Sequence, residues 1–61
     1  MNREDWSAFY GWLDTVDLPE LRTRHEQLNE LIPILRDREV RANALRMRKE
    51  IEGLILLYTR D

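Results

Sequence analysis

Apolar residues recur along the chain in two regular series separated by one change of phase. Steps of three and four residues give a first series, apolar except for one histidine, of Leu18, Leu21, His25, Leu28, Ile32 and Leu35. The same steps give a second series of Val40, Ala44, Met47, Ile51, Leu54 and Tyr58. This spacing places each series on one face of an α-helix, as in the seam between two helices packed side by side. The pattern predicts two long helices, over residues 18–36 and 38–59.

A step of five residues between Leu35 and Val40 breaks the phase and predicts a tight reversal at residues 36–39. In an antiparallel arrangement, every position of one series meets a position of the other. The predicted pairs are Leu35 with Val40, Ile32 with Ala44, Leu28 with Met47, His25 with Ile51, Leu21 with Leu54, and Leu18 with Tyr58. We therefore expect an antiparallel helical hairpin.

Pro33 lies inside the first of these helices, where it removes a backbone hydrogen bond and bends the helix. Residues 36–39 contain no glycine, and Asp37 has no glutamate three residues later to complete a capping box. Two alternatives stay open. The chain reverses at Pro33 instead, or residues 36–39 continue one long helix, kinked at Pro33, that pairs between two chains.

A shorter helix is predicted over residues 3–14. Asn2 is a suitable cap, and Glu4 and Asp5 would lie in the first turn, where carboxylates interact favourably with the helix dipole. Trp12 lies off the apolar stripe, so we expect it at the edge of this helix or in solvent. The stripe itself consists of Trp6, Phe9, Tyr10 and Leu13.

A capping pattern marks the start of the next helix. Asp17 can cap it, Glu20 can reach back to the cap, and Val16 can pack on Leu21 as a hydrophobic staple. Pro19 falls in the first turn, where its missing N–H group costs little. A second helix should therefore begin at residue 18.

Sixty-one residues leave room for one folding unit, so we predict a single all-α domain over residues 1–61. It would comprise the short N-terminal helix and the hairpin. The chain has no cysteine, no secretory leader and no apolar run near eighteen residues. We therefore expect a cytoplasmic protein without disulfides or a membrane span.

More residues are apolar than one hairpin can bury, and so small a chain without disulfides or metals gains stability most simply from a partner. We expect a homodimer that forms a helical bundle, or docking onto another protein; a monomer with exposed leucines is the alternative. Large aromatic and leucine side chains would supply most of the binding energy. The predicted interface residues are Trp6, Phe9, Tyr10, Trp12, Leu31, Ile34, Leu45, Ile55, Leu56 and Leu57.

These features predict a small adaptor or regulator that binds and modulates a host protein. In size and helical build the chain resembles the small helical proteins with which phages and mobile elements sequester host regulators. Arginine outnumbers lysine nine to one, a bias typical of GC-rich coding sequences, which points to a bacterium or one of its phages.

Positive charge is concentrated between residues 36 and 49, although the net charge of the chain is −2. The alternative function is therefore a nucleic-acid-associated regulator that uses this segment. A sequence pI near 5.3 and the absence of aromatic residues among the arginines favour a protein partner instead. The candidate residues for an anionic partner are Arg38, Arg41, Arg46, Arg48 and Lys49.

His25 and Glu26 match the start of the zinc-protease pattern H-E-x-x-H, but Asn29 stands at the second histidine position. The chain has no other histidine and no cysteine to complete a metal site. Glycine-rich phosphate loops and nucleophile elbows are also absent. We therefore predict no enzyme activity, no metal, no cofactor and no small-molecule substrate.

Overall fold

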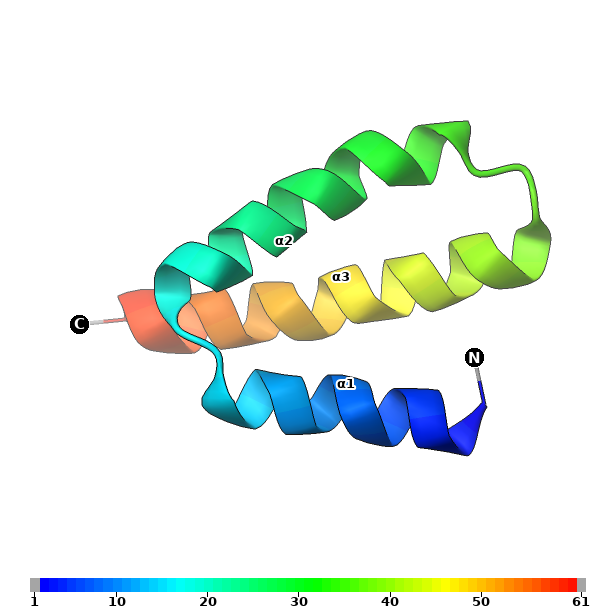
Figure 1. Ribbon diagram of the computed structural model, residues 1–61. Coiled ribbons are helices and arrows are strands. Elements are labelled where there is room, and N and C mark those ends of the chain that lie inside the picture. Colours follow the sequence, from blue (N-terminus) through cyan, green and yellow to red (C-terminus); the bar gives the residue numbers. More distant parts are fainter. Residues whose placement is uncertain (1, 61) are drawn as a thin grey trace.

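The computed structural model describes residues 2–60 and consists of three α-helices joined by short connections (Figure 1). Helix α1 spans Arg3–Thr15, α2 spans Leu18–Leu31 and α3 spans Arg38–Thr59, with a short 3-10 helix, η1, at Ile32–Ile34. No β-strand occurs in residues 2–60, so the predicted all-α class is confirmed. None of the helices in this part of the chain is long and apolar enough to cross a membrane.

Each α-helix begins at a side-chain cap. Asn2 accepts a hydrogen bond from the Asp5 amide at 2.9 Å, and the Asp5 carboxylate accepts one from the Asn2 amide at 3.4 Å. Asp17 and Asp37 accept bonds from the amides three residues later, at 3.2 and 3.0 Å. These bonds satisfy amides that have no partner inside their helix and fix where each helix starts.

Helix α2 ends at Leu31, five residues before the end predicted for it at residue 36. Pro33 explains the difference, because it has no amide to continue the α-helical ladder and its ring collides with the carbonyl four residues earlier. The chain tightens into η1, where the Leu35 amide donates to the Ile32 carbonyl at 3.2 Å. Pro33 thus ends the α-helix, whereas we had expected it to kink a longer one.

The connection between η1 and α3 is extended. Leu35 has φ −72° and ψ 126°, and Asp37 has φ −75° and ψ 125°. The chain therefore changes direction between Leu35 and Asp37, and residues 36–39 do not continue one long helix.

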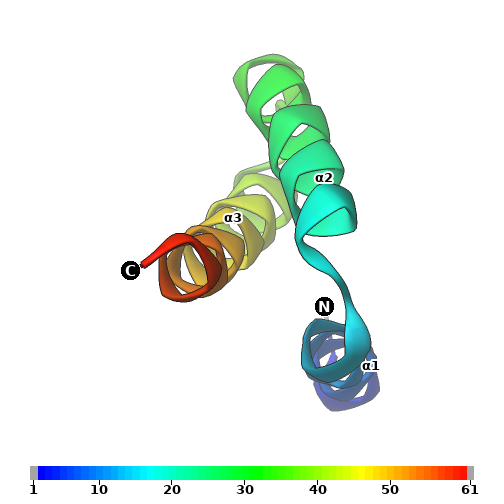
Figure 2. The same cartoon turned by 90° about the vertical axis from the view of Figure 1, so that its left-hand side faces the viewer.

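Helix α2 runs opposite to both α1 and α3 (Figures 1 and 2). The backbones of α2 and α3 contact each other, whereas α1 stands apart from the pair (Figure 2). Helix α1 has 13 residues and α3 has 22, and α3 extends past α1 at both ends (Figure 1). The Cα atoms fill a slab of 37 × 25 × 14 Å. Both ends of the α2–α3 pair therefore lack a third helix over them.

The core lies among the three helices. Leu21 and Ile51 are fully buried and belong to the two apolar series. Val40 and Tyr58, at the outer ends of the second series, are 48% and 51% exposed. These two positions lie in the first and last turns of α3. Among residues 2–60, eight side chains are buried: Phe9, Leu13, Val16, Leu21, Leu28, Ile32, Ala44 and Ile51.

Candidate protein-interaction surface

Four aromatic residues of α1 were predicted as anchors for a partner, and the structure places them against the chain's own core. Phe9 is 8% exposed, and Trp6, Tyr10 and Trp12 are half-buried around it. The centroid of the Phe9 ring lies 5.8 Å from that of Trp6, 5.6 Å from Tyr10 and 6.1 Å from Trp12. We call these four residues the aromatic cluster. It attaches α1 to the other helices, which corrects the role predicted for Phe9 as a surface anchor.

Trp12 was expected at the edge of α1 or in solvent, and it lies half-buried at the flank of the apolar stripe. Its ring stacks on Phe9 with an angle of 27° between the planes. Residues three apart on a helix are neighbours on its surface, which lets Trp12 join the cluster from the flank of the stripe. The guanidinium of Arg24 lies 5.5 Å from the centroid of the Trp12 ring. Helix α2 therefore contacts α1 through a cation and an aromatic face.

Arg46 makes the corresponding contact from α3. Its guanidinium carbon lies 4.2 Å from the centroid of the Trp6 ring, and its Nη2 donates to the Tyr10 hydroxyl at 3.1 Å. A cation over an aromatic face within about 6 Å is attracted by the quadrupole of the ring. Arg46 is one of the residues predicted for an anionic partner, and within the chain its guanidinium lies against α1.

The five basic residues predicted to form one patch lie around different sides of α3. Arg46 engages α1, whereas Arg48 donates to Asn29 on α2 at 3.1 Å and lies 3.7 Å from Glu52. The Arg41 guanidinium donates to a backbone carbonyl in the connection before α3. Arg38 and Lys49 are exposed. Because Arg46 and Arg48 face opposite flanks of α3, these side chains do not present a single basic surface.

The apolar residues predicted for the interface outside α1 are largely uncovered. Ile34 is 72% exposed, Leu56 69% and Leu57 64%. Leu31 and Leu45 are exposed to lesser degrees, and Ile55 is half-buried. Exposed clusters of large apolar side chains mark interaction sites more often than a scatter of single residues does. We call Leu31, Ile34 and Val40, which surround the α2–α3 connection, the turn-end group.

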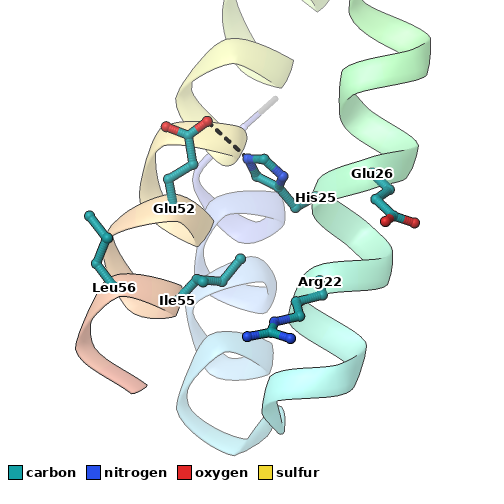
Figure 3. A pocket seen from close by; sticks show the side chains of 6 residues that line it. All are labelled: Arg22, His25, Glu26, Glu52, Ile55 and Leu56. Carbon is teal, nitrogen blue, oxygen red and sulfur yellow. Dashed lines mark hydrogen bonds and ion pairs between the residues drawn. The ribbon is translucent and has the colours of Figure 1, made fainter. Parts of the chain in front are cut away.

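A shallow hollow of about 440 Å³ lies between α2 and α3 (Figure 3). We call it the α2–α3 groove. Ile55 and Leu56 form its apolar part, while Arg22 extends from α2 toward α3 and Glu26 points away from α3 (Figure 3). Its lining residues are Arg22, His25, Glu26, Glu52, Ile55 and Leu56.

Hydrogen bonds cross one end of this groove. His25 donates from Nε2 to the Glu52 carboxylate at 2.9 Å and accepts at Nδ1 from the Asn29 amide group at 3.2 Å. Arg48 donates to the side-chain oxygen of Asn29 at 3.1 Å and lies 3.7 Å from the Glu52 carboxylate, so four polar side chains join α2 to α3. Both ring nitrogens of His25 are thereby engaged. Within residues 2–60, no group of three or more histidine, cysteine or acidic side chains is placed to hold a metal ion.

Searches against known protein families, curated proteins and solved structures found no significant match to this chain. The geometry of its own surface is therefore the basis for assigning a function. That surface combines a mixed-charge groove with large apolar side chains at both ends of the helix pair.

Proposed function

We propose that this chain is a small non-enzymatic helical interaction module, a dimeric adaptor or regulator that binds another protein. The observation that carries the proposal is the surface left uncovered by one chain. A compact monomer of this mass exposes about 4200 Å². This chain exposes 4945 Å². The excess, roughly 700 Å², is close to the ~800 Å² that each partner buries in a protein interface of standard size.

The shape of the molecule supports the same proposal. Its Cα radius of gyration is 11.9 Å. A compact domain of this length has a radius of about 10.5 Å. The slab is 14 Å thick in its shortest dimension, so one chain cannot enclose its apolar side chains on all sides. A second chain laid on the slab would bury apolar surface that the monomer leaves in water.

A nucleic-acid-associated regulator is less well supported. The basic side chains of residues 36–49 point to different flanks of α3, and several are bound within the chain. The net charge of −2 also opposes binding to phosphates.

Sedimentation equilibrium between about 1 and 200 μM tests the proposal, because association depends on concentration. We expect the mass to rise from 7.4 kDa toward twice that value. Raising the salt concentration should change the association little, because apolar contacts are not screened. A steep loss of binding to an oligonucleotide over the same salt range would favour the nucleic-acid alternative. A mass of 7.4 kDa at every concentration, with stability independent of dilution, would refute self-association.

A further inference from the structure

We infer that the α2–α3 groove binds a second copy of this chain across a two-fold axis, with Arg22 of each copy facing Glu26 of the other. This inference rests on the proposed self-association and assigns it to one face of the molecule. Three properties of the groove carry it: its position opposite α1, its apolar side chains Ile55 and Leu56, and the arrangement of its charges.

The groove opens on the side of the α2–α3 pair that α1 leaves uncovered. Figure 3 shows the groove in front and α1 behind the pair. Tyr10 and Leu13 of α1 lie beside Leu54 on the opposite flank of α3. A helix placed in the groove would therefore contact α2 and α3 without displacing α1.

The apolar part of the groove lies on α3. Leu56 is 69% exposed, and Ile55 lies half-buried beside it and extends this apolar area inward toward α2. Leu45 lies on the same flank of α3 about 16 Å away, with Lys49 and Glu52 between the two leucines. Ile55 and Leu56 are therefore the apolar contact that the groove offers to a facing helix.

The charged side chains that line the groove are those of Arg22, Glu26 and Glu52. Glu52 already contacts His25 and Arg48, so it is compensated within its own chain. Within residues 2–60, Arg22 and Glu26 form no ion pair.

A two-fold axis can pair these two unpaired charges between copies. In an isologous interface, a residue that contacts a second residue is contacted by it in return. Arg22 and Glu26 are one helical turn apart on α2, so an axis that passes between them makes the two α2 helices antiparallel. Each Arg22 then faces a Glu26 of the other copy, and the contact forms twice.

A second copy fits the groove better than a partner of one sign of charge. A polyanion would face the carboxylates of Glu26 and Glu52, and a wholly apolar helix would desolvate Arg22 and Glu26 without pairing them. A second copy supplies the opposite charge at the positions of Arg22 and Glu26. The net charge of −2 adds little repulsion between copies.

Charge reversal at the rim tests the inference. Arg22→Glu places carboxylates opposite each other in the dimer, and Glu26→Arg does the same with guanidinium groups. We expect each single variant to raise the dimer dissociation constant about tenfold or more at low salt, because like charges across an interface oppose association. An equimolar mixture of the two variants should restore a dimer containing one chain of each kind. The double variant Arg22→Glu with Glu26→Arg should restore the homodimer, because it exchanges the two charges.

Matched controls carry the same charge changes outside the groove. Arg36→Glu and Glu30→Arg alter exposed positions and should dimerise like the unmodified chain. Circular dichroism of every variant verifies that the helices form. Leu56→Glu should also give a monomer, whereas Ile34→Glu in the turn-end group should not.

The outcomes distinguish an error in the assigned interface from a failure of dimerisation itself. If the unmodified chain dimerises and the single variants and their mixture all dimerise with the same dissociation constant as it does, the groove assignment is wrong and the proposed function stands. Loss of the dimer in Ile34→Glu and not in Leu56→Glu would move the interface to the turn-end group and overturn the inference. If the unmodified chain is monomeric, the self-association itself fails.

Discussion

Helices α2 and α3 meet through buried aliphatic side chains and a set of hydrogen bonds at one side, whereas α1 is attached to them mainly through aromatic rings and two arginines. Leu21 and Ile51 are completely buried where α2 and α3 meet. Helix α1 stands farther from the pair (Figure 2), and large rings from its aromatic cluster fill the space. Its contacts with Arg24 and Arg46 lie at the protein surface. We therefore expect substitutions in the α2–α3 seam to lower the free energy of unfolding more than substitutions in the contacts of α1.

The largest predicted effect is in the seam. Leu21→Ala leaves a cavity at a position with no exposed surface, which should reduce the free energy of unfolding by about 2–5 kcal/mol. For a chain this small, that loss is comparable to the whole stability, so far-UV circular dichroism should show extensive loss of helix. Ile34→Ala, at a position 72% exposed, is the control and should change stability by less than about 0.5 kcal/mol. A loss below about 1 kcal/mol in Leu21→Ala would contradict the role given to the seam.

The docking of α1 should respond less to substitution. Arg46→Met keeps an apolar stem but removes the contact with Trp6 and the hydrogen bond to Tyr10, and should cost about 1–2 kcal/mol. Arg24→Met removes the more distant contact with Trp12 alone and should cost about 0.5–1 kcal/mol. Thermal unfolding followed by tryptophan fluorescence measures both. A larger effect for Arg24→Met would show that the aromatic cluster is held mainly from α2.

The same difference explains how much of the fold could be predicted from sequence. Helix caps and the three-and-four spacing are local signals, so the start of each helix and the buried seam positions Leu21 and Ile51 follow from them. The contact between Arg46 and Trp6 joins residues far apart in the chain, and no periodic pattern encodes it. The early end of α2 follows from Pro33, whose effect was recognised but was expected to be a kink.

The candidate surface shows a similar division. Leu56 and Leu57 were predicted as interface residues because the two series do not use them, and both side chains are exposed. Phe9 was predicted to be available to a partner because a stripe of aromatic residues looks the same whether it faces its own core or another chain. Val40 was missed, because its place at the end of an apolar series resembled a core position. The burial of Phe9 and the exposure of Val40 both depend on how the helices pack in three dimensions.

A small change in stability is expected for the two glycines, one in each region. Gly11 lies in α1 and Gly53 in α3, and an added Cβ would meet no atom within 4 Å at either position. Because glycine in a helix interior is less stable than alanine, Gly11→Ala and Gly53→Ala should each raise the free energy of unfolding by about 0.5–1 kcal/mol. Urea unfolding measures the change. Destabilisation by Gly53→Ala would indicate that α1 approaches α3 more closely than the structure shows.

The most direct test of the central claim is nuclear magnetic resonance on a mixture of isotope-labelled and unlabelled chains, which detects contacts between copies only. We expect intermolecular contacts from the methyl groups of Ile55 and Leu56 and none from Leu31 or Ile34. If a sample that sediments as a dimer gave no such contacts at Ile55 and Leu56, the α2–α3 groove would not be the surface through which this chain associates.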